Sequence, residues 1–149
     1  KIGLIYKVTE KTVEVFETDY LNPIKLKTSV YPGFPTDLQA QIVTLASLCK
    51  GNSEIQENIF ENRFMHVPEL NRLGAKIKIK GNKALIKGYS KLIGAEVMAT
   101  DLRASVSLIL AGLAANGVTR INRVYHLDRG YEKIENKLKR IGVKIKRIS

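Results

Sequence analysis

The stretch Thr36-Asp37-Leu38-Gln39-Ala40 returns later in the chain as Thr100-Asp101-Leu102-Arg103-Ala104. Further matches follow in the same order: Gly51 with Gly117, Arg63 with Arg129, and Gly74-Ala75-Lys76-Ile77 with Gly142-Val143-Lys144-Ile145. A repeat of this kind indicates one supersecondary unit stacked on its duplicate. Residues that occupy the same place in both copies are therefore expected to share a role.

Apolar periodicity and turn residues divide the chain into strands and helices. Ahead of the repeat they predict a hairpin of residues 2–6 and 12–16 and a strand over 24–30. The first copy predicts a helix that starts at Thr36 with a Thr36/Gln39 capping box, then a strand over 54–60, a helix from Pro68 to Gly74, and a hairpin of 75–79 and 84–87. The second copy predicts helices over 100–116 and 128–140 and strands over 120–125 and 143–148. The fold class is therefore α/β, built from repeated β-α-β-α-β-β units.

Composition is that of a globular protein, since 44% of the 149 residues are hydrophobic and 26% are charged. The longest apolar stretch, residues 106–115, is too short to span a bilayer. The single cysteine, Cys49, cannot form an internal disulfide, and no secretory signal precedes the first strand pattern. These features predict a cytoplasmic protein that acts without a membrane.

The formal net charge of +11 raises the question of nucleic-acid binding. The lysines at 76, 78 and 80 alternate with isoleucines, as do those at 144 and 146 with apolar residues, which is typical of the solvated face of an amphipathic strand. Aromatic residues make up only 7% and do not alternate with these lysines as stacking platforms would. The pattern therefore favours a solvated face, and no nucleic-acid partner is expected.

Charged residues at the predicted helix starts mark a candidate site. Asp37 and Asp101 are expected one residue inside their helices, where the helix dipole favours a carboxylate. Arg103 is a cation in a first turn, against the dipole, where the first copy has Gln39. An arginine beside free helix N–H groups makes an anion site, because both direct positive charge at one point.

Arg63 and Arg129 occupy strand-to-helix turns in the two copies. Together with Arg103 they are placed to converge on a phosphate or carboxylate, which a planar guanidinium binds in bidentate fashion. The alternative is that these arginines form structural salt bridges with Glu61, Asp101 and Asp128. Spacing alone leaves both possibilities open.

The remaining candidate residues give weaker evidence for a functional site. His66 and His126 lack the spacing of a metal pair, and Cys49 is expected to be a small buried residue near the end of a helix. The 11 glycines are scattered at helix ends and turns and form no phosphate-binding loop. No metal and no cofactor are therefore expected.

Four long motifs give the chain a family resemblance. They are Tyr31-Pro-Gly-Phe-Pro-Thr-Asp-Leu-Gln-Ala-Gln41, Phe60-Glu-Asn-Arg-Phe-Met-His-Val-Pro-Glu-Leu70, Gly94-Ala-Glu-Val-Met-Ala-Thr-Asp-Leu-Arg-Ala104 and Tyr125-His-Leu-Asp-Arg-Gly-Tyr-Glu132. In them the chain closely resembles the enolpyruvyl transferase family, and within it the UDP-N-acetylglucosamine 1-carboxyvinyltransferases. The resemblance runs from about Tyr31 to the end of the chain, whereas residues 1–30 match only in strand pattern.

The resemblance implies a two-domain enzyme, each domain holding three β-α-β-α-β-β units around a pseudo-threefold axis. Residues 1–149 would be most of the C-terminal domain: 1–30 the tail of one unit, about 31–90 the second unit and about 91–149 the third. A start at Lys1 rather than Met agrees with a fragment. The missing N-terminal catalytic domain would be its partner and would carry the loop cysteine that acts as general acid, so the isolated chain is expected to be inactive.

The resemblance also implies a reaction. The 3′-hydroxyl of UDP-GlcNAc adds to C2 of phosphoenolpyruvate, and phosphate then leaves, in the first committed step of peptidoglycan synthesis. Asp37 matches the carboxylate that contacts this hydroxyl and is the expected general base, and Ile59 matches a residue whose backbone contacts the nucleotide sugar. Arg103 and Arg129 match arginines that hold phosphoenolpyruvate. Two further residues match polar groups that line the cleft, namely Arg63 and Asp101.

Two other functions stay open at this point. A shikimate-pathway enolpyruvyl transferase shares the fold and the phosphoenolpyruvate chemistry, although the motifs that start at Phe60 and Tyr125 favour the sugar-nucleotide enzyme. A non-catalytic basic module that binds anions or nucleic acid is the second alternative, and steeply salt-dependent affinity would identify it.

Overall fold

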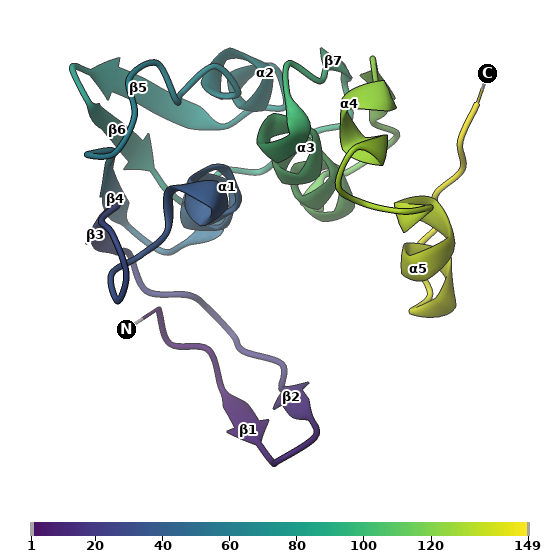
Figure 1. Ribbon diagram of the computed structural model, residues 1–149, viewed down its shortest axis with the longest axis horizontal. Coiled ribbons are helices and arrows are strands. Elements are labelled where there is room, and N and C mark those ends of the chain that lie inside the picture. The colour runs from purple at the N-terminus through teal and green to yellow at the C-terminus, as the bar shows by residue number, and fades with distance from the viewer. Residues whose placement is uncertain (1, 149) are drawn as a thin grey trace.

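The computed structural model describes residues 2–148 (Figure 1). Helices from the two copies of the repeat pack against one another between a four-stranded and a two-stranded sheet. The N-terminal hairpin of β1 (Tyr6–Val8) and β2 (Val13–Val15) projects away from these layers and is exposed. Its strands pair antiparallel with Tyr6 opposite Val15, so the expected hairpin is present, but its first strand lies at Tyr6–Val8 and not over 2–6.

The first copy forms a complete sheet with its helices. Its elements are β3 (Lys25–Lys27), the 3₁₀ turn η1 (Thr36–Leu38), α1 (Gln39–Leu48), β4 (Asn52–Gln56), α2 (Val67–Arg72), β5 (Lys76–Lys80) and β6 (Lys83–Lys87). The strand order is β3-β4-β6-β5, with β3 parallel to β4 and the other neighbours antiparallel. This order confirms the expected β-α-β-α-β-β unit, and it places β3 in the same sheet although β3 precedes Tyr31.

One face of this sheet is buried and the other carries the lysines. Ile55 and Ile86 point inward and pack with Val43 of α1 and Leu70 of α2 in the main hydrophobic core. Lysines of β5 and β6 point outward, as the alternating pattern predicted. Ile79 departs from that pattern and is exposed, since it lies close to the hairpin turn.

The second copy begins in the same way. Its elements are β7 (Glu96–Met98), α3 (Leu102–Ala114), β8 (Arg120–Asn122), α4 (Tyr125–Asp128) and α5 (Ile134–Arg140). β7 and β8 are parallel, as β3 and β4 are. α3 packs beside α1, and the Thr44 hydroxyl of α1 donates to the Ser107 carbonyl of α3 at 3.3 Å. The starts of α1 and α3, far apart in sequence, therefore lie side by side.

Two predictions for the end of the chain are wrong. The helix expected over 128–140 begins only at Ile134, as α5, because the chain turns after α4 ends at Asp128 and Lys133 adopts a left-handed φ of 43°. The strand expected over 143–148 does not form within the part of the chain that the structure describes. In the first copy the matching strand, β5, pairs with β6.

None of the helices in residues 2–148 combines the length and apolarity needed to cross a membrane.

Candidate functional site

η1 presents Asp37 to solvent between Pro35 and the start of α1, with 68% of the Asp37 side chain exposed. The predicted capping box is wrong, because the Thr36 hydroxyl donates to Oε2 of Glu57 at 3.0 Å and the Gln39 side chain is buried. The N-cap of α1 is Leu38, which makes no side-chain cap bond. The Thr36 hydroxyl therefore links this turn to Glu57, at the end of β4, instead of capping the helix.

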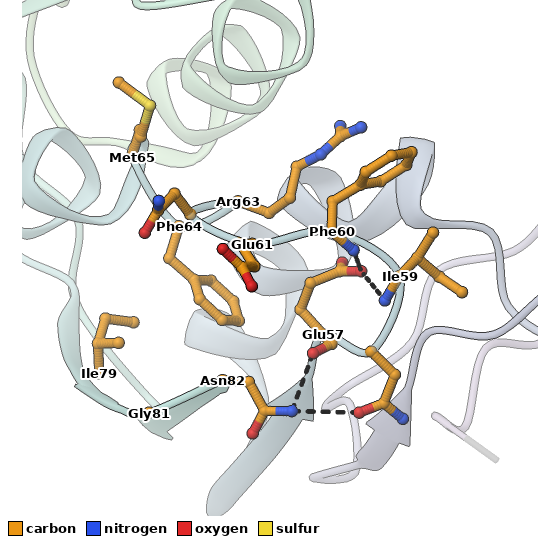
Figure 2. Close-up of a pocket in the computed structure, with 12 residues that line it drawn as sticks. Glu57, Ile59, Phe60, Glu61, Arg63, Phe64, Met65, Ile79, Gly81 and Asn82 are labelled. Carbon is orange, nitrogen blue, oxygen red and sulfur yellow. Dashed lines mark hydrogen bonds between the residues drawn. The ribbon is translucent and has the colours of Figure 1, made fainter.

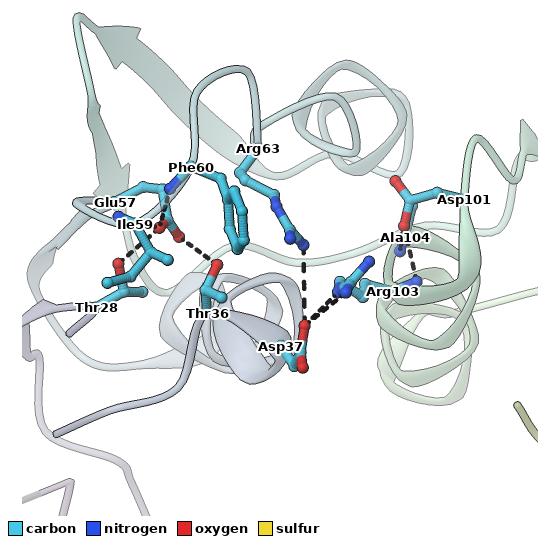
Figure 3. Close-up of polar contacts among 10 residues, drawn as sticks. All are labelled: Thr28, Thr36, Asp37, Glu57, Ile59, Phe60, Arg63, Asp101, Arg103 and Ala104. Carbon is cyan, nitrogen blue, oxygen red and sulfur yellow. Dashed lines mark hydrogen bonds and ion pairs between the residues drawn. The ribbon is translucent and has the colours of Figure 1, made fainter. Parts of the chain in front are cut away.

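Two of the predicted arginines meet at Asp37 (Figure 3). Nε and Nη2 of Arg103 each lie 2.6 Å from Oδ1 of Asp37. Nη1 of Arg63 lies 4.0 Å from the same oxygen. Within residues 2–148, Oδ2 of Asp37 accepts no hydrogen bond. The cluster thus holds one carboxylate oxygen between two cations and leaves the other open.

Asp101 has a different role from the one its position suggested. Its backbone is extended, with φ of −158°, so it is the N-cap of α3 and not a first-turn residue. Oδ1 of Asp101 accepts from the backbone N–H groups of Arg103 at 2.8 Å and Ala104 at 3.1 Å. The expectation of free N–H groups for an anion is wrong here, because the Asp101 carboxylate occupies them. α3 therefore contributes the Arg103 side chain to the site, and Asp101 fixes the helix end that carries it.

Arg63 is held against an aromatic ring. Its guanidinium lies over the Phe60 ring, 4.4 Å from the centroid, and 20% of its side chain is exposed. Asn62, just before it, has a left-handed φ of 53°, which bends the loop so that Arg63 points toward Asp37. The alternative of a structural salt bridge to Glu61 is not found among residues 2–148, where Arg63 pairs with Asp37.

Glu57 is a residue that the sequence reasoning missed. It is 3% exposed, and its carboxylate accepts from the Thr28 hydroxyl at 2.8 Å and the Thr36 hydroxyl at 3.0 Å. It also accepts from the N–H groups of Ile59 at 2.8 Å and Phe60 at 3.2 Å. One signal could have revealed it: Ser53 and Ile55 are alternate residues of β4, and Glu57 continues this spacing one residue past the strand, which places it on the buried side.

Ile59 lies in the loop that Glu57 organises. Its N–H is taken by Glu57, while its carbonyl oxygen accepts no hydrogen bond from residues 2–148. The backbone group left for a ligand is therefore the carbonyl, which is an acceptor.

Arg129 does not join the cluster. It follows α4 as the C-cap residue and is exposed, and in the described part of the chain its side chain makes no hydrogen bond or ion pair. The predicted alternative partner, Asp128, pairs with Arg147 instead, with Nη2 2.6 Å from Oδ1. The Arg147 guanidinium lowers the pKa of Asp128 below its usual range.

Two buried side chains that could carry chemistry, His66 and Cys49, do not join the Asp37 cluster. His66 is 2% exposed and its Nε2 has no hydrogen-bond partner in residues 2–148. Burial lowers the pKa of His66 from 6.5 to about 4, although the Asp101 charge opposes this. Cys49 is fully buried, as expected, and burial raises the pKa of its thiol. No cluster of His, Cys, Asp or Glu suited to a metal occurs among residues 2–148.

A surface depression of about 790 Å³ adjoins the loop of residues 57–65 (Figure 2). Phe64 and Asn82 point into it, whereas the Arg63 guanidinium points away from it. The Asn82 side-chain amide donates to the Glu57 carbonyl at 3.0 Å, which closes one wall. The loop of residues 57–65 therefore borders the depression on one side and Asp37 on the other.

Known proteins resemble this chain over its whole length. A curated relative from Pelagibacter ubique is 60% identical over 151 residues, and one from Helicobacter hepaticus is 54% identical over 148 residues. Both are named UDP-N-acetylglucosamine 1-carboxyvinyltransferase. These matches cover 100% and 99% of this chain but only 36% and 35% of the relatives. The chain therefore spans about a third of the length of the curated relatives it matches.

Solved structures agree on the fold. The enolpyruvyl transferase NikO from Streptomyces tendae superposes with a TM-score of 0.90 at 30% identity, over 97% of this chain and 34% of that chain. An EPSP synthase from Acinetobacter baumannii superposes with a TM-score of 0.69 at 15% identity, over 99% of this chain and 35% of that chain, and so supports the fold alone. The family model of EPSP synthase (3-phosphoshikimate 1-carboxyvinyltransferase) matches residues 1–138. With the duplicated α/β unit and this match over nearly the whole chain, the protein belongs to the EPSP synthase family of enolpyruvyl transferases.

Proposed function

We propose that this chain is part of a UDP-N-acetylglucosamine 1-carboxyvinyltransferase. The enzyme would transfer the enolpyruvyl group of phosphoenolpyruvate to the 3′-hydroxyl of UDP-GlcNAc and release phosphate. The names of relatives at 54% and 60% identity support this acceptor. The observation that carries the chemistry is the Asp37 carboxylate, with one oxygen held by Arg103 and the other open.

Asp37 acts as the general base in this proposal. Oδ2 takes the proton of the 3′-hydroxyl while the hydroxyl oxygen forms its bond to C2 of phosphoenolpyruvate. C3 gains a proton in the same addition, from a general acid outside this chain. In the elimination, the C2–O bond to phosphate breaks, C3 loses a proton and the double bond re-forms. The exposure of Asp37 supports the role, since a substrate can reach it.

Arg103 and Arg129 bind phosphoenolpyruvate in this proposal. The Asp37–Arg103 pair is exposed, and such pairs contribute only about 0–1 kcal/mol, so an incoming anion can take over the Arg103 donors at little loss. Arg129 is exposed and has no partner in residues 2–148, so its donors are also open to a ligand.

Ile59 and Arg63 serve the acceptor side. The Ile59 carbonyl, which accepts no hydrogen bond from residues 2–148, offers an acceptor to an N–H or O–H of the nucleotide sugar. Arg63, stacked on Phe60, keeps a second positive charge 4.0 Å from Asp37. Asp101 contributes indirectly by capping the helix that carries Arg103.

The rest of the active site would come from an N-terminal domain of the same protein. The chain covers 35% and 36% of two relatives, so their other parts have no counterpart here. We place the chain in the C-terminal one of two domains, each with three units about a pseudo-threefold axis, and expect the isolated chain to be inactive. The reaction would serve peptidoglycan synthesis in the cytoplasm, and with it cell shape and division, without a cofactor.

Phosphate release by the full-length product of the parent reading frame tests the proposal. The protein would receive phosphoenolpyruvate with either UDP-GlcNAc or shikimate 3-phosphate. Release with UDP-GlcNAc alone is expected. Release with shikimate 3-phosphate alone would assign the shikimate-pathway reaction, and release with neither would leave anion or nucleic-acid binding, to be tested by its salt dependence.

A further inference from the structure

Glu57 is a buried carboxylate at which three separate segments of the chain meet. It is 3% exposed and accepts hydrogen bonds from the end of β3, from η1 and from its own loop. We propose that Glu57 is a positioning residue, which holds the turn carrying Asp37 and the backbone of Ile59 in one fixed arrangement for the nucleotide sugar. The inference rests on the proposed function for its substrate, and on the hydrogen bonds alone for the positioning.

The hydrogen bond between Thr36 of η1 and Glu57 sets the position of Asp37. Thr36 donates its hydroxyl to Oε2 of Glu57 at 3.0 Å, and Asp37 is the next residue (Figure 3). η1 has no side-chain cap of its own, so this bond is the side-chain anchor of the turn among the described residues. The Asp37 side chain is exposed, and within residues 2–148 its hydrogen bonds and ion pairs are all to arginine side chains, so it depends on the turn for its position.

The contacts with the loop control the Ile59 carbonyl and Arg63. Oε1 of Glu57 accepts from the N–H groups of Ile59 at 2.8 Å and Phe60 at 3.2 Å, which fixes the peptide planes on both sides of Ile59. The Ile59 carbonyl belongs to the peptide whose N–H comes from Phe60, so its direction is set by this bond. The Phe60 ring in turn supports the Arg63 guanidinium 4.4 Å from its centroid.

A carboxylate suits this position because both oxygens are acceptors. Four donors converge on Glu57, three of them at Oε1. A glutamine can keep the three bonds at one oxygen, while its NH₂ group faces Thr36, whose hydroxyl can turn to accept. An alanine loses all four and leaves buried donors without partners, which is the more costly change.

Ser53 provides a matched control on the same strand. It is buried on the same side of β4, and its hydroxyl oxygen accepts from the Ile24 N–H at 3.0 Å. Ser53→Ala therefore removes a partly buried hydrogen bond between β4 and the segment before β3, without changing a bond to η1 or to the loop at Ile59. If loss of stability alone raised the KM, Ser53→Ala would raise it too, although by less, because it loses fewer hydrogen bonds than Glu57→Ala.

The experiment compares Glu57→Ala, Glu57→Gln and Ser53→Ala in the full-length protein. With Glu57→Ala we expect the KM for UDP-GlcNAc to rise about tenfold, which corresponds to the free energy of one typical hydrogen bond. The KM for phosphoenolpyruvate should stay within about twofold. Glu57→Gln should remain near the wild type, and Ser53→Ala should change neither KM. Unchanged KM values in Glu57→Ala, with loss confined to melting temperature, would assign Glu57 a purely structural role and overturn the proposal.

Backbone hydrogen exchange separates this inference from the proposed function, because it needs no activity. In Glu57→Ala, exchange should rise together in residues 33–38 and 58–62 and stay unchanged there in Ser53→Ala. A rise in only one of these segments would overturn the link between them. If the wild type releases phosphate with neither acceptor, the proposed function fails, and the exchange result still decides whether Glu57 holds both segments.

Discussion

Oδ1 of Asp37 receives both Nε and Nη2 of Arg103 at 2.6 Å, and the two residues come from the two copies of the repeat. Asp37 belongs to the Thr-Asp sequence that precedes α1, and Arg103 to the first turn of α3. Because α1 and α3 pack side by side, the duplication brings the starts of both copies together. The candidate site is therefore a product of the repeat: one copy supplies the base and the other the cation.

Asp37→Asn in the full-length protein should abolish phosphate release and leave stability nearly unchanged. The amide cannot accept the proton of the hydroxyl, whereas an exposed ion pair contributes only about 0–1 kcal/mol to folding. The measurements are steady-state phosphate release and thermal unfolding. Glu54→Gln is the control, since it also removes an ion pair, to Lys83, but on the outer face of the sheet, and it should retain activity. A folded, active Asp37→Asn would exclude Asp37 as the base.

Arg129→Ala should raise the KM for phosphoenolpyruvate at least tenfold, the usual scale for a charge-assisted hydrogen bond, with little change in melting temperature. Stability should hold because Arg129 is exposed and bonds to no other side chain in residues 2–148. Arg140→Ala, at the end of α5 and equally exposed, serves as the control and should behave as wild type. Equal phosphoenolpyruvate KM values in both variants would remove Arg129 from the substrate site.

The sequence predicted the first copy of the repeat well. Periodicity and turn residues located α1, α2 and the β5–β6 hairpin because local signals suffice there: Pro68 opens α2, and Gly74, with φ of 94°, stands just after its end. It also selected Asp37, Arg63 and Arg103, which the fold brings together. All three are charged residues at element ends, and Arg103 was selected because a cation in a first turn opposes the helix dipole.

The partners of these residues could not be read from the sequence. The contact between Asp37 and Arg103 depends on how two helices pack, and no local pattern encodes it. The capping box failed for the same reason, since a distant carboxylate, Glu57, competes for the Thr36 hydroxyl. The prediction of a helix over 128–140 was wrong because nothing in the sequence clearly indicates that Lys133 adopts a left-handed backbone conformation.

Gly94→Ala should destabilise the protein by about 2 kcal/mol or more, the range in which forced backbone shifts fall. A Cβ at Gly94 would lie 2.3 Å from the Val118 carbonyl oxygen, and backbone cannot move aside as a side chain can. Gly81→Ala is the comparison, because a Cβ there meets nothing and only its φ of 58° opposes the change, at about 1 kcal/mol. Denaturant unfolding of both variants measures the difference, and equal losses would contradict the close approach at Gly94.

His66 should make stability fall as the solution becomes acidic. Its pKa is 6.5 when exposed and about 4 in the folded chain, where burial disfavours the charged form. Between these values the unfolded state binds the proton and the folded state does not, so acid favours unfolding. The contribution is fully present above pH 6.5 and falls by about 3 kcal/mol as the pH reaches about 4.

His66→Gln removes this titration, and the test is the difference between variant and wild type in free energy of unfolding from pH 7.5 to pH 4. The neutral amide binds no proton in either state, so the wild type should lose stability relative to the variant by up to about 1.4 kcal/mol per pH unit. The slope should appear only below about pH 6.5, since above it both states of the wild type are neutral. Parallel curves for the two proteins would mean that His66 can be protonated without leaving its buried place beside Asp101.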